Sequence, residues 1–593
     1  MRLRLFYHIK MMKPFFLVIV CCLPVLVTAQ RHDNTTLLGY YGGFITPPDD
    51  DLGISVLTFP DGSLQMEENF ELTMYFDFTN AAFSDSSGTL QCYSNGVNLM
   101  NALWDTIQNG ETLTTDRPGA SIWPQFALAL PKPGHSDQVV LLYGDEEIMY
   151  PFGPQGELWI VSHNLYAAEI DMAANQGAGE VLSKGEIVVQ DSLALGKFTA
   201  CKHANGRDWW ILAQKHNSKK FYRILLDPQG FHNMGTQIVS GVKMYDGMGQ
   251  ACFSPNGEHY VMYDGVTFDS IIGEFLNIYR FNRCTGMLSH HQQINLLPGS
   301  IGGVAFSPNS RYFYHNNFLK AYQYDMQASN IAASKTLVAE WDGYHGARFL
   351  FLQLMPDNKI YSSTSTITDV LHVIQYPDEA GTACNYEQHA VHLPTRNSRS
   401  VPNFPNFRLG PLDGSSCDTL GLDNFPIAWY RYEQDTLDPL SVEFRDLSYY
   451  EPTNWSWDFG DGSMGSSERH PKYVFDSAGI YQVCLTVSNA NASNTHCKSL
   501  YLGVTSTENP VLQSQIVVSP NPFSNRLGIA LSTKLRSPVF YLYNQMGNLL
   551  REVRLTFGVT EIETESLEPG MYFWEVMSNG GRVKAGKIVK AGQ

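Results

Sequence analysis

The feature that most constrains this chain is a turn that recurs through its long central region. Each copy is rich in Gly, Asn, Pro or Asp, and a short strand of aromatic or branched residues follows it. Most copies lie about fifty residues apart, which is the spacing of a structural repeat. The turns are Asp85–Gly88, Lys132–His135, Ala204–Arg207, Ser254–Gly257, Ser307–Ser310 and Met355–Asn358.

One tight hairpin in each repeat predicts a β-propeller. A lone four-stranded sheet cannot bury both of its faces, whereas sheets arranged in a closed ring bury them against one another. Beyond these turns, a further blade can be assembled from residues 38–75 together with the segment before residue 410. We therefore predict seven blades, with six and eight as open alternatives. The wider gap after the second turn predicts an insertion around Ala167 to Lys184.

The composition agrees with an all-β fold and requires several domains. The chain has 593 residues, whereas single cores stop growing at roughly 250 to 300 residues. Aromatic residues make up 12% of the chain beside 49 Gly and 30 Pro, which favours short strands over long helices. The formal net charge of -18 argues against a nucleic-acid partner, because such a partner needs a basic face.

The N-terminus predicts a secretory signal peptide over residues 1–29. A basic stretch precedes the apolar run Phe15–Leu23, and small residues follow up to Ala29. We expect cleavage between Ala29 and Gln30. The apolar run is too short to span a membrane and no other segment approaches that length, so we expect no transmembrane segment in the mature chain.

Residues 38–410 resemble the WD40-like, YVTN-type propeller of exported proteins. The matching segments are spread along the whole region. The resemblance implies a fold and an exported context, and it implies no particular activity. These segments are Phe83–Leu90, Tyr93–Gly96, Pro131–Gly134, His203–Trp210, Ala383–Tyr386, Leu393–Pro394 and Pro402–Phe404.

Residues 423–505 resemble the polycystic-kidney-disease (PKD) domain, an immunoglobulin-like sandwich. The resemblance rests on a Trp-x-Phe-Gly-Asp-Gly motif and on a later Gly-x-Tyr-x-Val strand. Two aromatic residues of the motif alternate onto one face of a strand, and Gly-Asp-Gly supplies the positive φ angles of a tight hairpin. The motif residues are Trp457, Asp458, Phe459, Gly460, Asp461 and Gly462.

Residues 511–593 resemble the type A C-terminal sorting domain of the bacterial type IX secretion system. A Pro-Asn-Pro opening is followed by strands, a turn, a Gly-Met-Tyr strand and a final Lys-Ile-Val-Lys. The resemblance implies export across the outer membrane by the type IX machinery and removal of the tail. An ordinary terminal β-sandwich is the alternative. The motif residues are Pro520, Asn521, Pro522, Gly547, Gly570 and Tyr572.

The cysteines favour one disulfide. Cys484 and Cys497 stand on two strands that a polar turn would join as an antiparallel hairpin, and disulfides persist in exported chains. Two buried free thiols are the alternative reading. The pairing of the other cysteines outside the leader stays open; these are Cys92, Cys201, Cys252, Cys284, Cys384 and Cys417.

No catalytic motif is found, so we assign no catalytic or cofactor-binding residue and leave metal binding undetermined. Asp458 and Asp461 could suggest a cation site, but acidic side chains beside a Gly turn more often cap the local backbone. The histidines lack a ligand spacing, and no Gly-x-Ser-x-Gly elbow is present. Trp209 and Trp210 are expected in the core rather than as a sugar platform, since neighbouring strand residues point to opposite faces.

These features predict an exported all-β protein: a β-propeller, a PKD-like β-sandwich and a small C-terminal β-sandwich sorting domain. The leading function is binding, adhesion or scaffolding in the medium or at the cell surface, without a cofactor. The predicted partners are the type IX machinery and an extracellular glycan or protein. The alternative is a secreted hydrolase or lyase that acts on polysaccharide, peptide or lactone at the propeller channel. Rigid rings that carry loops suit recognition, whereas clustered titratable groups at the channel mouth would favour catalysis.

Overall fold

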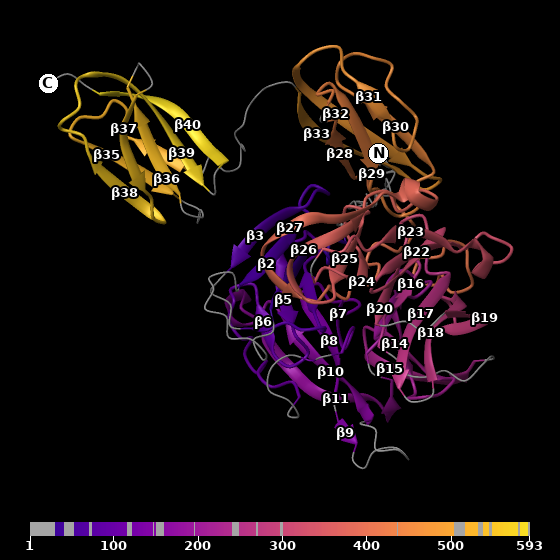
Figure 1. The fold of residues 1–593 in the computed structure, drawn as a ribbon. Coiled ribbons are helices and arrows are strands. Elements are labelled where there is room, and N and C mark those ends of the chain that lie inside the picture. Colours follow the sequence, from indigo (N-terminus) through magenta and orange to yellow (C-terminus); the bar gives the residue numbers. More distant parts are fainter. Residues whose placement is uncertain are drawn as a thin grey trace, which may run out of the picture. The chain divides into compact units, whose positions relative to one another are not determined.

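The computed structural model is essentially all-β (Figure 1). Its helical segments are the 3-10 turns η1 (Asn175–Gly177), η2 (Ala332–Ser334) and η3 (Gly381–Cys384) among the described residues. Within those residues no helix is long and apolar enough to cross a membrane. The described residues are 30–40, 53–69, 74–114, 121, 123–145, 147–149, 159–194, 196–239, 248–268, 271–296, 301–344, 346–435, 437–502, 516–531, 538–544, 548–578 and 581–590.

The described strands between residues 35 and 398 form seven antiparallel sheets, each built from consecutive strands of the chain. This is the up-and-down order of propeller blades. The first sheet holds β1 (Thr35–Leu38), β2 (Ile54–Thr58) and β3 (Gln65–Asn69), the second holds β4 (Ala81–Ser84), β5 (Leu90–Ser94) and β6 (Leu99–Asn101), and the third holds β7 (Ala127–Pro131), β8 (Gln138–Gly144), β10 (Trp159–Asp171) and β11 (Glu180–Leu193), with β9 (Glu147–Met149) beside β10. The fourth sheet holds β12 (Thr199–Lys202), β13 (Trp209–Gln214), β14 (Lys220–Asp227) and β15 (Gly230–Ile238), and the fifth holds β16 (Ala251–Phe253), β17 (His259–Phe268), β18 (Ile271–Asn282) and β19 (Met287–Leu296). The sixth sheet holds β20 (Gly302–Phe306), β21 (Tyr312–Asn317), β22 (Lys320–Asp325) and β23 (Thr336–Glu340), and the seventh holds β24 (Phe349–Leu354), β25 (Ile360–Thr364), β26 (Ile367–Ile374) and β27 (Tyr386–Ser398).

The first and last sheets meet and close the ring. Strand β27 contacts β1, β2 and β3, and the hydroxyls of Ser55 and Thr395 lie 2.8 Å apart across this contact. A propeller blade has four strands, but two of the seven sheets have only three described strands. The number of seven blades therefore remains a prediction from the spacing of the turns. Inside the third sheet, residues Ala167 to Lys184 are the end of β10, the turn that contains η1 and the start of β11, and Ala167–Asp171 pair with β8. The expected insertion at these residues is wrong, because they form regular blade strands; an additional strand, β9, lies earlier in the same gap.

Five of the six repeated turns, all except Lys132–His135, share one local structure. A side-chain oxygen of Asn or Asp accepts a hydrogen bond from the backbone N–H two residues further on, as Asn256 Oδ1 does from Glu258 at 3.1 Å and Asn309 Oδ1 from Arg311 at 2.9 Å. Asp357 makes the same bond to Lys359 at 3.1 Å. This is the Asx turn that makes Asn and Asp strong turn formers.

Aromatic side chains fill the blades. Trp209 and Trp210 are 0% and 2% exposed, so both pack in the core, as the alternation of strand faces predicts. The indole N–H of Trp210 donates to the carbonyl of Arg283 at 2.7 Å, which joins the fourth and fifth sheets. Buried aromatic rings and the paired N–H group together hold neighbouring blades in contact.

The segment after β27 runs along the centre of the ring. It forms no strand within described residues 399–410, so it does not complete a blade as we expected from sequence. The side-chain amide of Asn403 donates to the carbonyls of Ala127 and Phe198 at 2.9 and 2.8 Å, and its Oδ1 accepts from Gln125 at 3.2 Å. Phe407, further along, is fully buried. The channel is therefore occupied by the protein's own chain.

The next domain is a sandwich of two three-stranded sheets. Trp457 is 2% exposed and Phe459 is 1% exposed, and the Trp457 ring lies 5.0 Å from that of Tyr430 and 5.3 Å from that of Phe444. Gly460 and the second glycine of the motif have φ angles of 74° and 82°. One sheet holds β28 (Tyr430–Gln434), β29 (Ser441–Asp446) and β31 (Lys472–Val474); the other holds β30 (Asn454–Asp458), β32 (Gly479–Ser488) and β33 (Ser493–Leu502).

The C-terminal domain belongs to a second compact unit. Its core contains Phe523, Tyr572 and Trp574, and the Asn521 side-chain oxygen accepts from the Val589 N–H at 3.0 Å. Pro520 and Pro522 follow cis peptide bonds. Its two sheets are β34 (Ile516–Ser519), β35 (Arg526–Leu531) and β38 (Gly558–Glu563), and β37 (Leu549–Arg554), β36 (Val539–Tyr543), β39 (Gly570–Ser578) and β40 (Gly581–Lys590).

Replacing Asn403 should destabilise the propeller. An Asn403→Ala variant leaves two buried carbonyls without a donor, so we expect the free energy of unfolding to fall by roughly 2–4 kcal/mol. Denaturant unfolding followed by tryptophan fluorescence measures this loss. The exposed Asn233→Ala is the control, and equal stabilities of the two variants would contradict a stabilising role for the channel segment.

Candidate binding site at one end of the propeller channel

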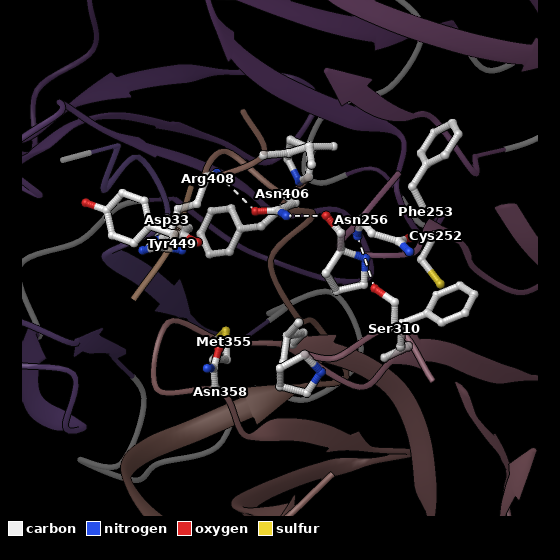
Figure 2. Close-up of a pocket in the computed structure, with 18 of the residues that line it drawn as sticks. Asp33, Cys252, Phe253, Asn256, Ser310, Met355, Asn358, Asn406, Arg408 and Tyr449 are labelled. Carbon is white, nitrogen blue, oxygen red and sulfur yellow. Dashed lines mark hydrogen bonds and ion pairs between the residues drawn. The ribbon is translucent and has the colours of Figure 1, made fainter. Parts of the chain in front are cut away.

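Three consecutive blade turns gather at one end of the channel. They bring Asn256, Asn309 and Asn358 to the wall of one cavity, and Figure 2 labels the first and the last of these. Neighbouring turns are tied to each other, since the Asn256 N–H donates to Ser310 Oγ at 3.0 Å. The Asn309 N–H donates to the carboxylate of Asp378 at 2.9 Å. The repeated turn thus places the equivalent carboxamides of Asn256 and Asn309 at the cavity, and in the third turn Asp357 holds that position and Asn358 follows it.

The end of the channel segment forms a second wall. The Asn406 side-chain amide donates to the carbonyl of Pro255 at 2.7 Å, and its oxygen accepts from the Arg408 N–H at 3.0 Å (Figure 2). The Arg408 guanidinium makes two bonds of 2.6 Å to the carboxylate of Asp33. Such a bidentate pair fixes both side chains and neutralises the charge at this wall.

A loop of the sandwich, residues 447–452, forms the third wall. Tyr450 and Glu451 have φ angles of 64° and 55°, which is uncommon for residues other than Gly, Asn and Asp. The Asn489 side-chain amide donates to the carbonyls of Asn424 and Tyr450 at 2.7 and 3.2 Å and so holds the loop. Strained backbone of this kind gathers at functional sites, and the observation points to this loop.

Charged side chains fix the sandwich to the propeller turns. Arg431 is 4% exposed at its side chain and donates to the carbonyl of Asp357 at 2.8 Å. Lys359 pairs with Glu433 at 2.6 Å. The Arg31 guanidinium lies 3.7 Å from the centroid of the Trp429 ring, a cation–π contact. The loop over the cavity is thereby held in one place.

The three walls enclose a partly open cavity of about 320 Å³. Its apolar lining includes Phe253, Met355 and Tyr449. Burial raises the pKa of the Glu451 carboxyl, Asp413 raises it further and Arg283 opposes the shift. The pKa values of Tyr449 and Tyr450 in the same wall are raised as well, and Glu451 is the carboxyl among these groups, so it is the candidate for proton chemistry here.

The two PKD-motif carboxylates lie elsewhere and cap turns. Asp458 Oδ1 accepts from the Gly460 N–H at 2.9 Å, and Asp461 Oδ1 accepts from the Ser463 N–H at 2.9 Å. Both side chains are exposed, and the described part of the chain holds no group of three or more His, Cys, Asp or Glu residues arranged for a metal ion. Ala29 and Gly547 lie outside the described residues.

Two disulfides form among the described residues. Cys484 and Cys497 join β32 to β33 with a Cα–Cα distance of 4.0 Å, at the hairpin where we expected a bond. Cys284 and Cys417 also bond, with a Cα–Cα distance of 5.6 Å. The thiols of Cys92, Cys201 and Cys384 are buried and free, and Cys252 is partly buried.

Sequence reasoning found the turns but not the site. The Asn residues were visible as turn formers, whereas nothing near Asp33, Arg408 or Glu451 marks them as neighbours. The Cys284–Cys417 bond was equally hidden, since 133 residues separate the two cysteines. A repeat alignment of the turns is the signal that could have placed the carboxamides of Asn256 and Asn309 on one rim, but it aligns Asp357 rather than Asn358 with them.

Removing the long-range disulfide should cost more stability than removing the hairpin one. In the chain-entropy model a disulfide stabilises more when it closes a longer loop, and the separations are 133 and 13 residues. We expect Cys284→Ala/Cys417→Ala to lower the unfolding free energy by about 2 kcal/mol more than Cys484→Ala/Cys497→Ala. Thermal unfolding and non-reducing peptide mapping check this, and a larger loss from the hairpin pair would contradict it.

Acid should weaken the propeller through His32. Its ring stacks on Phe83 at 4.8 Å and contacts Phe407. Burial lowers its pKa from 6.5 to about 4; the bond to the Ser84 carbonyl and Asp33 oppose this shift, and Lys202 and Arg408 add to it. The unfolded chain therefore binds more protons between pH 4 and 6.5, so stability is complete above pH 6.5 and falls as pH falls through this window.

The pH effect is measured by denaturant unfolding at several pH values. Between pH 6.5 and pH 4 we expect the unfolding free energy of the His32→Gln variant to fall less than that of the wild type, by up to about 3 kcal/mol. The exposed His290→Gln is the control. Parallel pH curves for His32→Gln and the wild type would contradict the assignment.

Two segments of the chain match known domain families. Residues 432–504 match the PKD domain, and residues 517–591 match the secretion system C-terminal sorting domain. No curated protein matches the chain.

Solved structures share parts of the fold. The PKD1 domain of the Vibrio cholerae metalloprotease PrtV is 30% identical over 13% of this chain and 94% of its own, with a TM-score of 0.12. A putative 6-phosphogluconolactonase from Bacteroides fragilis is 13% identical over 61% of this chain and 96% of its own, with a TM-score of 0.35. PorZ, a surface component of the type-IX secretion system of Porphyromonas gingivalis, is 10% identical over 94% of this chain and 100% of its own, with a TM-score of 0.18.

The two family matches agree with the domains described above. A PKD domain follows the propeller, and a C-terminal sorting domain ends the chain. The chain is therefore a PKD-containing protein that the type IX secretion system delivers to the cell surface or the extracellular space.

Proposed function

We propose that this protein is an extracellular recognition protein, in which the propeller and the PKD domain act together as one binding unit. Its proposed parts are a signal peptide of residues 1–29, a propeller of residues 38–410, a sandwich of residues 423–505 and a sorting domain of residues 511–593. An extracellular glycan or protein is the proposed partner, and adhesion or scaffolding at the cell surface is the proposed role.

The observation that carries this proposal is the filled channel. Asn403 and Phe407 occupy the axis where a propeller enzyme of the lactonase type would need open space for substrate. Binding through a rigid rim needs no such space. A scaffold of packed blades with its loops in fixed positions supports recognition, because little conformational entropy is lost on binding.

The buried contacts between propeller and sandwich support the joint role. Arg431 of the sandwich donates to the carbonyl of Asp357 in the propeller, and Lys359 of the propeller pairs with the carboxylate of Glu433 in the sandwich. Residues of both domains line the cavity, and most of those from the sandwich come from the loop of residues 447–452. A ligand at the rim would therefore contact both domains at once.

A second candidate function rests on Glu451. A carboxyl whose pKa is raised, set in a cavity wall, is suited to act as a general acid. This observation favours a hydrolase or lyase that acts on a polysaccharide, peptide or lactone. It is weaker than the first candidate because a general acid needs a second group to act as base or nucleophile.

One experiment separates these functions. The mature chain is applied to arrays of glycans and peptides and, in parallel, to a panel of polysaccharide, peptide and lactone substrates. We expect saturable binding with no product formed. Turnover that Glu451→Gln abolishes would instead establish the second candidate. If the chain showed no binding and no turnover, both candidates would be contradicted.

A further inference from the structure

The rim of the cavity carries hydrogen-bond donors that the protein itself does not use. The side-chain oxygens of Asn256 and Asn309 accept turn hydrogen bonds, but neither side-chain nitrogen donates a bond within the described residues. Asn358 makes no side-chain hydrogen bond within that part of the chain, although it is half-buried. All three line the cavity, and Figure 2 places Asn256 and Asn358 on opposite sides of its open space.

The two arginines of the cavity wall are already paired. Arg408 is paired with Asp33 by two bonds of 2.6 Å, and Arg469 is paired with Asp446 at 2.8 Å. Among the described residues that line the cavity, no arginine or lysine is therefore left to attract a phosphate, sulfate or carboxylate, and the net charge of -18 repels such groups at long range. Glu451 is the remaining carboxyl of the wall, and because burial raises its pKa the wall favours a neutral ligand over an anion.

The remaining walls combine apolar faces with polar edges. Phe253, Met355 and Tyr449 present apolar surface, and the carboxamides lie between them. Amides both donate and accept, which suits hydroxyl groups that also do both. Apolar faces suit the C–H face of a sugar ring. A volume of about 320 Å³ is near the small end of ligand pockets, roughly 300–1,000 Å³.

We propose that this cavity binds a neutral saccharide of one or two rings, either free or at the end of a longer glycan. The carboxamides of Asn256, Asn309 and Asn358 would bind its hydroxyls, and the sandwich loop at Tyr449 would cover one face. This inference rests on the proposed recognition function, and it adds the site and the chemical class of the ligand.

The test removes the free donors and keeps the turns. In Asn256→Asp/Asn309→Asp each side-chain oxygen can still accept its turn bond, but the N–H donors are lost. The chain itself has Asp357 at the equivalent turn position of the next blade, so the variant should fold. Asn233→Asp is the matched control, because Asn233 is exposed on β15 and its oxygen likewise accepts from a nearby N–H, that of Gly235 at 3.0 Å.

Binding is measured with the mature chain on an array of neutral, sialylated and sulfated glycans. Calorimetry follows with maltose, cellobiose, lactose and di-N-acetylchitobiose. We expect neutral glycans to bind the wild type and the control equally, and the double variant to bind at least about tenfold more weakly. Circular dichroism and the unfolding temperature verify that the double variant is folded.

Each other outcome overturns a definite part of the proposal. Equal binding by the folded double variant and the wild type overturns the cavity as the site but leaves the recognition function in place. Preference for sialylated or sulfated glycans, or binding of peptides alone, overturns the ligand class. Absence of any binding by the wild type overturns the recognition function itself.

Discussion

The structure depends on the passage of the protein's own chain through the centre of the propeller. Asn403 connects this segment to the inner strands of different blades through buried carbonyls, and Phe407 fills the space beyond it. Without the segment the inner strands would surround an open channel. With it, the channel becomes part of the core, and ligand binding moves to the end of the ring.

The same segment decides how the next domain is mounted. It leaves the channel beside Arg408, whose bond to Asp33 joins the end of the propeller to its beginning. The Cys284–Cys417 disulfide then ties the connecting chain to the fifth sheet. The sandwich consequently starts from a fixed point, and its strained loop at Tyr450 and Glu451 lies over the blade turns. The cavity exists because two domains meet there, and neither one encloses it alone.

Much of the fold could be predicted because its signals are local. The Asn and Asp turns act through bonds that span two residues, and the Trp457 motif acts within a single hairpin. The Cys484–Cys497 pair followed from a hairpin visible in the sequence. The errors were also local in origin: the gap around Ala167 to Lys184 was interpreted as an insertion, whereas ladder pairing extends β10 and β11 through most of it.

The sequence by itself determined the all-β class, the propeller repeat, the PKD domain and the route of export, since each is written in short motifs whose physics is complete within a few residues. Only the tertiary structure decided that the channel is filled, that Cys284 bonds to Cys417 and that three carboxamides share one rim with a loop of the sandwich. The contact of Asp33 with Arg408 joins residues 375 apart. Such a pair has no periodicity and no local preference, because its energy arises only after the ring has closed and brought the two side chains together.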